Sequence, residues 1–432
     1  MSTEWTKVPR RAVHATRFTR REVPARRRPS SDASAERGPT TTVARTEYPA
    51  KATHAQTRAH NAGLVLRALY DLGPISRADI ARLTGLTRTS VGELVADLER
   101  DGLATDVGRG PSTGGKQPTL VALDDDARTV ITLDLGERTF SAALANLRGE
   151  LTTRRTRALD GADGAAALQL VHGLIDDVRR EATTPILGVG VGTPGIVDAD
   201  GTIRWAVNLD WQDLPLATIL RERHGLPTVV ANDSRVAALA TYLFAGDDRP
   251  QNLVVVRVGR GIGAGLILRD QLFGGDGEGA GEIGHVVVEP DGIACHCGRF
   301  GCLETIASAP AILRAAARAG LPPTTTIDDL ARASADGDDR ALPVVRAAGR
   351  AIGAAIANLT GALDVRRITV LGTVTALGEP WFAAIREEAS RRSLGPLARE
   401  THIIDGGPGD DATLLGACAL LLTRELGLTV HR

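Results

Sequence analysis

Three of the chain's four cysteines lie close together in the segment GHVVVEPDGIACHCGRFGCLE, residues 284–304. Cys295, Cys297 and Cys302 fall within eight positions, and His285 stands ten residues before the first of them. Zinc prefers thiolate and imidazole ligands, four of them in a tetrahedral arrangement. The sequence therefore predicts a zinc site built from these four side chains.

The chemistry of such a site depends on its ligand number and its context. Four protein ligands leave no open coordination position, which favours a structural zinc over a catalytic one. The CxC spacing differs from the CxxC of thiol–disulfide enzymes, so a redox centre is the weaker interpretation. A DNA-reading zinc finger has two ligand pairs flanking its own helix, whereas this segment reads as an isolated loop. We expect a structural clamp inside a larger domain, and we expect Cys418 to pack in a core.

Composition bounds the class of protein. The chain has 432 residues, enough for two or three domains, and 43% of them are hydrophobic, as in a soluble globular protein. Apolar runs such as LLGACALLL are shorter than the roughly 20 residues that span a bilayer, and no apolar signal-peptide core follows the start. We expect a cytoplasmic protein with no membrane partner, where clustered cysteines bind metal more often than they form disulfides.

The net charge of −1 hides an uneven distribution. Residues 1–55 carry 12 Lys and Arg against 5 Asp and Glu, whereas the remainder carries 39 against 47. This basic segment shows no apolar period, so we expect a disordered tail. Its RREVPARRRPS run could add non-specific phosphate contacts. The alternatives are a purely solvated tail and a translation start placed too early.

The next segment, residues 61–104, has the pattern of a helix-turn-helix. The first helix is expected from about Asn61 to Leu72, and Ser76 with Asp79 reads as a capping box for a short second helix. Gly85 marks a tight turn and Thr87 caps a third helix. That helix buries the i, i+3, i+4, i+7 set Val91, Leu94, Val95 and Leu98. A short helix, a glycine turn and a longer amphipathic helix are typical of a helix-turn-helix.

This segment also predicts a DNA-binding surface. The start of the third helix turns outward the positions that a recognition helix offers to base edges, namely Arg88, Thr89, Ser90 and Glu93. A strand, a Gly/Pro-rich turn and a returning strand then form a wing, with Arg109, Lys116 and Gln117 at or near its tip. We expect a winged helix-turn-helix over residues 56–123. The alternative is a three-helix bundle that binds protein.

From Arg128 onward the pattern changes to α/β. Three consecutive strands are followed by an Ala-rich helix and a buried strand that ends in VGTPGIVD. A similar strand, glycine turn and strand recurs at NLVVVRVGRGIGAGLILRDQLF, and long helices follow, the clearest over 341–363. Two such units predict a duplicated α/β fold with a cleft between its lobes.

Several motifs in this region resemble the ROK family (repressors, open reading frames and sugar kinases). They are GEIGH followed by CHCGRFGCLE, with VGTPGIVD, NLDW at 208–211 and ANDSRVAALA at 231–240. The resemblance covers about residues 58–432, and the winged helix resembles that of the family's regulators. It implies an actin-like, ribonuclease-H-like fold over 128–432. Lobe one is expected over about 128–248 plus the C-terminal helix, and lobe two over about 249–405.

The resemblance also implies a sugar site in the cleft. The residues expected to line the sugar are Asn232, Asp233, Glu282, His285 and Glu304, with Gly195 and Asn208 as further candidates. In ROK proteins the residue matching His285 binds zinc and also faces the sugar. A metal-bound imidazole is fixed in tautomer and orientation, which leaves its other N–H free to donate to a hydroxyl.

The same resemblance raises the question of a kinase. Asp233 corresponds to the catalytic base of the family's kinases, which takes the proton of the attacking hydroxyl. The nucleotide side departs from the kinase pattern: the first phosphate turn has Glu137, the second has Arg260, and a GG pair reads Gly372-Thr373. The degenerate nucleotide site then comprises Asp134, Gly136, Gly259, Gly261, Gly263 and Gly372. Phosphate cradles need bare N–H groups and small side chains, so we expect ATP not to bind.

Three hypotheses follow. The first is a sugar-responsive regulator, a repressor, that binds operator DNA as a homo-dimer or tetramer with structural zinc. The second is an ATP-dependent sugar kinase with a DNA-binding domain. The third is a DNA-bound scaffold with a vestigial cleft that answers to a protein partner.

Overall fold

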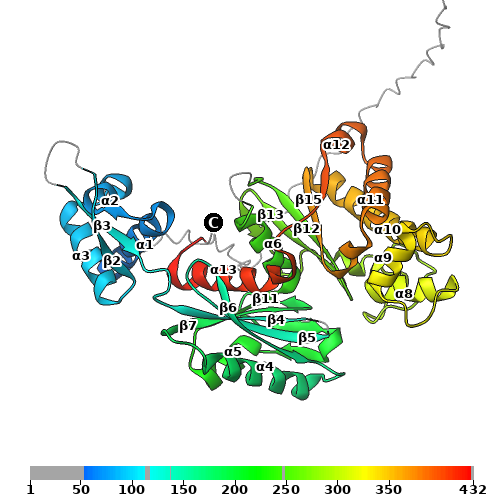
Figure 1. Cartoon of the computed structure of the whole chain (residues 1–432), viewed down its shortest axis with the longest axis horizontal. Helices are drawn as coiled ribbons and strands as arrows, with labels where there is room; N and C mark the ends of the chain where they lie inside the picture. The colour runs from blue at the N-terminus through cyan, green and yellow to red at the C-terminus, as the bar shows by residue number, and fades with distance from the viewer. Residues whose placement is uncertain (1–52, 112–116, 137, 246–248, 430–432) are drawn as a thin grey trace, which may run out of the picture. The chain divides into compact units, whose positions relative to one another are not determined.

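The computed structural model describes residues 53–111, 117–136, 138–245 and 249–429. Most of the predicted tail, together with Lys116 and Glu137, lies outside the described residues. Four sheets and the helices around them make up this part of the chain (Figure 1). None of its helices has the length and apolar character to cross a membrane.

The winged helix forms as the local signals predict. It comprises α1 (His54–Leu72), β1 (Ile75–Ser76), α2 (Arg77–Thr84), α3 (Arg88–Arg100), β2 (Ala104–Arg109) and β3 (Thr119–Leu123). The strands form one sheet in the order β1-β3-β2. Thr87 accepts from the backbone N–H of Ser90 at 3.1 Å, and Gly85 takes the left-handed conformation at the end of α2. The four predicted apolar positions of α3 are buried.

Two local predictions need correction. Helix α1 begins at His54 and not at Asn61, because Thr53 and Gln56 form a reciprocal capping box. Ser76 caps α2 by accepting from the N–H of Asp79 at 3.1 Å, but the pair is not reciprocal. The Asp79 carboxylate instead accepts from the Ser76 hydroxyl at 2.6 Å.

The first large sheet has five strands in the order β11-β7-β4-β5-β6. Their bounds are β4 (Thr129–Leu135), β5 (Thr139–Ala145), β6 (Leu151–Ala158), β7 (Ile186–Thr193) and β11 (Thr228–Asn232). Helices α4 (Gly164–Arg179) and α5 (Leu216–His224) cover one face, while α13 (Ala412–Leu426) covers the other (Figure 1). A small sheet of β8 (Ile196–Val197), β9 (Ile203–Ala206) and β10 (Trp211–Leu214) follows β7, with η1 (Val207–Leu209) between its last two strands.

The second large sheet has the order β14-β13-β12-β15-β16. Its strands are β12 (Leu253–Val258), β13 (Ile262–Leu268), β14 (Gln271–Phe273), β15 (Arg367–Leu371) and β16 (His402–Asp405). The helices around it are α7 (Glu304–Ala307), α8 (Ala309–Arg318), α9 (Ile327–Ala335), α10 (Ala341–Leu363), α11 (Glu379–Arg392) and α12 (Gly395–Glu400). Short 3-10 turns are η2 (Ile283–His285), η3 (Thr373–Leu377) and η4 (Gly409–Asp411).

The two sheets repeat one pairing scheme. Strand β4 pairs antiparallel with β5 and parallel with β7, and β12 likewise pairs antiparallel with β13 and parallel with β15. Helix α6 (Asp233–Leu243) packs against α13 and also against β12 and β13. Helix α6 therefore lies between the sheets, and the predicted duplication of an α/β unit is present.

The winged helix shares a hydrophobic core with the first sheet and α13. Buried residues of both, among them Leu69, Tyr70, Val130 and Leu421, belong to one cluster. Polar contacts add to it: Arg67 of α1 donates to the carbonyl of Gly427, the C-cap of α13, at 2.8 Å. The Arg148 guanidinium lies 4.1 Å from the centre of the Tyr70 ring and donates to its carbonyl at 2.8 Å. Cys418 is fully buried in α13, as expected.

A buried histidine pair joins α4 to the end of α5. Nδ1 of His172 lies 3.1 Å from Nε2 of His224, whose Nδ1 lies 3.6 Å from a carboxylate oxygen of Asp176. Burial lowers the pKa of both imidazoles, and the positive charge of Arg223 lowers both further, whereas Asp176 acts in the opposite direction. Both rings are therefore stable as neutral groups in the folded chain.

This pair predicts a pH-dependent stability. The unfolded chain takes up protons at these histidines as the pH falls through about 6.5, while the folded chain resists protonation, so stability falls with decreasing pH. We expect the melting temperature to drop between pH 7.5 and 5.5 in the wild type. The drop should be smaller in the double variant His172→Gln/His224→Gln, as measured by differential scanning fluorimetry. The exposed His60→Gln serves as control, and an equal drop in all three proteins would contradict the prediction.

Candidate functional site

A cavity of ≈ 550 Å³ lies where the ends of β11, β12 and β13 meet the loop 282–304. Its lining includes the seven residues that the resemblance placed at the sugar: Gly195, Asn208, Asn232, Asp233, Glu282, His285 and Glu304. These positions are spread over 110 residues of sequence, and apart from Asn232 at the end of β11 they lie in loops and short turns or at helix starts. Acceptors and donors that converge in this way suit a polyol, whose hydroxyls each donate and accept hydrogen bonds.

The junction between β11 and α6 positions two of these side chains. Asn232 is the N-cap of α6, and its Oδ1 accepts from the N–H of Arg235 at 3.1 Å. Its Nδ2 donates to the carbonyl of Gly195 at 2.9 Å, which holds the loop after β7 against the helix start. Asn232 therefore links the start of α6 to the loop at Gly195, both of which border the cavity.

Asp233, the first residue of α6, is buried and has partners on both carboxylate oxygens. Its Oδ1 accepts from the N–H of Ser234 at 2.6 Å and from the Ser234 hydroxyl at 3.1 Å. Its Oδ2 forms an ion pair with the Arg257 guanidinium of β12. The carboxylate expected to act as a base in a kinase therefore already has partners on both oxygens.

Two further carboxyls face the same cavity. Burial, together with the negative charges of Asp233 and Glu304, raises the pKa of Glu282 to about 7. Glu304 begins α7, and its Oε2 accepts from the N–H of Ile262 at 3.2 Å. Near neutral pH, Glu282 is therefore present in both forms and is able to donate as well as accept.

Gly195 is required by sterics. Its φ is +91°, and a Cβ at this position would lie 2.2 Å from the carbonyl oxygen of Trp205. The loop after β7 thus passes directly over β9, which brings Trp205 and Asn208 to the cavity wall. Any side chain at Gly195 would push this wall away.

The structure brings the four predicted metal ligands together. The ligand atoms of His285, Cys295, Cys297 and Cys302 lie within 4.8 Å of one another. The sulfurs of Cys297 and Cys302 are 3.6 Å apart, and Nδ1 of His285 lies 3.6 Å from the sulfur of Cys295. Tetrahedral zinc with bonds of about 2.3 Å to sulfur and about 2.0 Å to nitrogen requires separations of about 3.8 and 3.6 Å. The set therefore fits a zinc ion.

The fold of the loop supports this geometry. Cys295 donates its N–H to the carbonyl of Arg299 at 2.7 Å, and Gly298 closes the turn with a φ of +84°. Nδ1 of His285 faces the sulfur of Cys295. His285 and Cys297 both line the cavity. A metal held here would fix the His285 ring and brace the cavity wall.

The predicted nucleotide residues are only partly at the cavity. Gly261 and Gly263 line it, whereas Asp134, Gly136, Gly259 and Gly372 are not among its lining residues. Steric needs explain two of these glycines. A Cβ on Gly372 would lie 2.4 Å from the carbonyl oxygen of Val258, and a Cβ on Gly263 would lie 2.5 Å from the Ser234 hydroxyl. These glycines are thus needed for packing whether or not a phosphate binds.

The predicted DNA-binding residues lie on one domain. Arg88, Thr89 and Glu93 of α3 are exposed, and Ser90 is half-buried with its hydroxyl 2.9 Å from that of Thr87. Arg109 ends β2 and is exposed, as is Gln117 ahead of β3. Ser90 is thus partly committed to the helix cap, and the other residues remain available.

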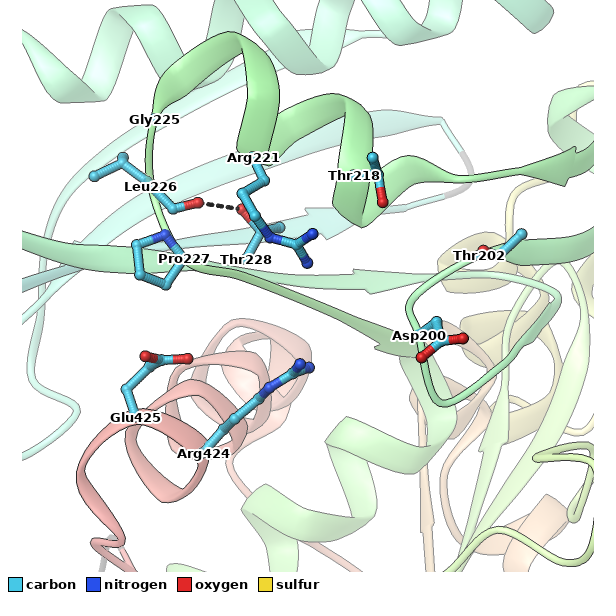
Figure 2. Close-up of a pocket in the computed structure, with 10 residues that line it drawn as sticks. All are labelled: Asp200, Thr202, Thr218, Arg221, Gly225, Leu226, Pro227, Thr228, Arg424 and Glu425. Carbon is cyan, nitrogen blue, oxygen red and sulfur yellow. Dashed lines mark hydrogen bonds between the residues drawn. The ribbon is translucent and has the colours of Figure 1, made fainter. Parts of the chain in front are cut away.

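A second, more open depression of ≈ 890 Å³ lies elsewhere on the first sheet. Figure 2 shows Arg424 and Glu425 of α13 on one side of it and Arg221 and Thr218 of α5 on the other. These side chains are exposed, and the one hydrogen bond drawn, from Thr228 to the carbonyl of Leu226 at 3.0 Å, stabilises the chain itself. The less open cavity, with the buried carboxylate of Asp233 and the half-buried Glu282 and Glu304, is therefore the better candidate site.

Sequence reasoning missed part of the cavity lining. The missed side chains include Trp205, Arg257, Val286, Val287, His296 and Arg299. Arg257 had a signal in the sequence, because it interrupts the otherwise apolar strand LVVVRV. A charge in a buried strand needs a partner, but the sequence does not say which one.

Comparison with known proteins decides the family. A model of the ROK family matches residues 130–424, and a model of the MarR family matches residues 57–110. The chain belongs to the ROK family. It carries a MarR-type winged helix ahead of the ROK domain, and both parts agree with the resemblance drawn from the motifs.

Relatives of known name align with most of this chain and most of their own length. The chain is 29% identical over 390 residues to the xylose repressor of Caldicellulosiruptor bescii, covering 86% of this chain and 98% of that one. It is 30% identical over 378 residues to the DNA-binding transcriptional dual regulator NagC of Escherichia coli, covering 84% and 92%.

Solved structures support the fold. A ROK family transcriptional regulator, a homologue of the Escherichia coli MLC protein, aligns with a TM-score of 0.74 at 26% identity, covering 86% of this chain and 96% of that one. A ROK family glucokinase from Streptomyces griseus, in complex with glucose and AMPPNP, aligns with a TM-score of 0.62 at 27% identity, covering 68% and 98%. The predicted two-lobed, actin-like fold with a winged helix is thereby confirmed.

The metal site yields a direct prediction. Cys297→Ser and Cys302→Ser each remove one of four ligands, so we expect purified protein to hold well below the roughly one zinc per chain of the wild type. Inductively coupled plasma mass spectrometry measures the content. Cys418→Ser, in the core of α13, is the matched control and should keep its zinc. Equal zinc in all four proteins would show that these thiols do not bind the metal.

Proposed function

We propose that this protein is a sugar-responsive transcriptional repressor. The observation that carries the proposal is the presence, in one chain, of a cavity lined by convergent acids and amides and a winged helix with an exposed recognition face. The curated relatives support it, since they are named as a xylose repressor, as the transcriptional dual regulator NagC and as an N-acetylglucosamine repressor. The ligand is then a neutral monosaccharide or a close derivative.

In the proposed site, the sugar lies between the sheets. Asn232, Asp233, Glu282 and Glu304 accept from its hydroxyls, and His285 donates through Nε2, the nitrogen not facing the thiols. Gly195 and Asn208 contribute the wall of the small sheet. Zinc supplies rigidity here, and each unmade hydrogen bond would leave a buried polar group at a cost of about 1–3 kcal/mol. Such a site rejects ligands with missing hydroxyls.

The contacts of α6 suggest how the sugar reaches the DNA. Helix α6 begins at Asp233 in the cavity and packs along α13. The C-cap of α13 at Gly427 accepts from Arg67 of α1, in the winged helix. If the sugar binds better to one arrangement of α6, it raises the population of that arrangement. The arrangement of the winged helix that is coupled to it then becomes more populated too. In a homo-dimer this shift changes the spacing of two recognition helices, which operator half-sites must match.

A thermal-shift screen combined with DNA binding tests the proposal. We expect D-xylose, N-acetyl-D-glucosamine or D-glucose to raise the melting temperature. The same sugar should weaken binding of the protein to its own promoter fragment, as measured by fluorescence anisotropy. A sugar that stabilises the protein without changing DNA affinity would leave a binding protein but not a sugar-responsive repressor.

The two functions predict separable variants. Arg88→Ala should weaken DNA binding about tenfold or more, as expected for a lost base or phosphate contact, and should leave sugar affinity unchanged. Cys297→Ser should lower zinc content and sugar affinity together. The exposed Arg318→Ala of α8 is the control for both measurements. Loss of sugar affinity in Arg88→Ala would contradict the separation of the two surfaces.

A sugar kinase is the second candidate, favoured by the position of Asp233 in the cavity and by the similarity to a glucokinase. The ion pair of Asp233 with Arg257 and the departures at Arg260 and Thr373 make it the weaker one. ATP turnover that requires a sugar and disappears in Asp233→Asn would establish it.

A further inference from the structure

Arg257 is an unusual residue for its place in the fold. It is the fifth residue of β12, and the other five are buried and apolar. Alternation along the strand puts Arg257 on the face of Leu253 and Val255, which pack with Ala237 and Ala238 of α6. The side chain is 22% exposed and lines the cavity. A cation among apolar side chains that face a helix destabilises the fold unless an anion pairs with it.

Its partner is the carboxylate at the start of the same helix. Nη1 of Arg257 pairs with Oδ2 of Asp233, whose side chain is 11% exposed. Opposite Arg257 on β13 stands Gly263, where a Cβ would lie 2.5 Å from the Ser234 hydroxyl. The glycine thus allows Ser234 to approach and to donate to the other oxygen of Asp233. Strand β12, strand β13 and helix α6 together build this arrangement.

The pair offers complementary groups to one ligand oxygen. A carboxylate has about four acceptor positions and a guanidinium has five donor N–H groups, so each partner retains capacity after the ion pair forms. A hydroxyl beside the pair would donate its hydrogen to Asp233 and accept from Arg257. The same engagement opposes proton abstraction, because Asp233 is charge-compensated and already accepts on both oxygens.

We infer that Arg257 is a specificity-determining residue of the sugar site, and that the Arg257–Asp233 pair recognises a single ring hydroxyl of an uncharged sugar as both donor and acceptor. The inference rests on the proposed sugar-binding function. An anionic sugar is disfavoured, because Asp233 matches the positive charge of Arg257, and the carboxyls of Glu282 and Glu304 line the same cavity as the guanidinium of Arg299. Arg257 then reads a hydroxyl and not a phosphate.

Isothermal titration calorimetry tests this with defined probes. The wild type, Arg257→Ala, Arg257→Lys and Asp233→Asn are titrated with D-xylose, D-glucose, N-acetyl-D-glucosamine and glucose 6-phosphate. Monodeoxy analogues of the neutral sugar that binds are then titrated. We expect Arg257→Ala and Asp233→Asn each to weaken binding about tenfold or more, as for hydrogen bonds to charged groups. Arg257→Lys should bind weakly too, since an ammonium cannot present the planar fork.

The decisive result is the identity of the hydroxyl. Removal of one particular hydroxyl should lower the sugar affinity of the wild type about tenfold and that of Arg257→Ala and Asp233→Asn only slightly. Removal of any other hydroxyl should lower the affinity of all three proteins by the same factor. Because Arg257→Ala leaves a buried carboxylate unpaired, the neutral double variant Arg257→Gln/Asp233→Asn provides a folded comparison. Arg318→Ala is the control, and zinc content and melting temperature are measured for every variant.

The outcomes distinguish a failure of the proposed function from a failure of the role assigned to Arg257. If the wild type binds no sugar, the proposed function fails and this inference falls with it. If the wild type binds a sugar that Arg257→Ala and Arg257→Lys bind equally well, only the role of Arg257 is wrong. Tight binding of glucose 6-phosphate that is lost in Arg257→Ala would overturn the assignment to an uncharged hydroxyl.

Discussion

The cavity depends on the point at which β11 ends and α6 begins. A helix start exposes backbone N–H groups that need acceptors, and Asn232 satisfies one of them while its amide nitrogen holds the loop at Gly195. The next residue, Asp233, is thereby fixed in place, and α6 carries it into contact with the second sheet. Because α6 packs against both sheets, Asp233 meets Arg257 of the second sheet close to the loop at Gly195.

The loop that completes the cavity has little core of its own. Val286, Ile293 and Phe300 are about half exposed, at 53%, 49% and 59%, so apolar burial contributes little to holding residues 286–302 in shape. Four ligand atoms within 4.8 Å can replace that missing core, since a metal contributes binding free energy directly to folding. His285 belongs both to this candidate ligand set and to the cavity wall, so a metal bound here would tie the order of the loop to the shape of the site.

The glycines in the two turns that resemble phosphate-binding turns are also needed for packing. The lack of a side chain at Gly263 leaves room for the Ser234 hydroxyl. A Cβ on Gly372 would lie 2.4 Å from the carbonyl oxygen of Val258. The first close approach belongs to the packing of β13 on α6, and the second to the packing of the turn after β15 on β12. The turns therefore keep much of their glycine pattern even where Arg260 and Thr373 replace small residues, and a glycine pattern alone does not report a phosphate site.

The sequence by itself determined what is local or chemically distinctive. It predicted the helix over 341–363, the caps at Ser76 and Thr87, the set of metal ligands and, through its motifs, the family and the seven residues around the cavity. Such signals depend on residue type and on spacing along the chain. The sequence misplaced the start of α1, where the Thr53–Gln56 box adds nearly two turns that carry no clear apolar period.

Only the tertiary structure decided which distant groups meet. Arg257 and Asp233 lie 24 residues apart on a strand and a helix that could pair with many partners, and the packing of α6 on β12 selects this one. The contact of Arg67 with Gly427 spans 360 residues. The first contact arises because two sheets share α6, and the second because the winged helix packs on α13; no local pattern in the sequence encodes either one.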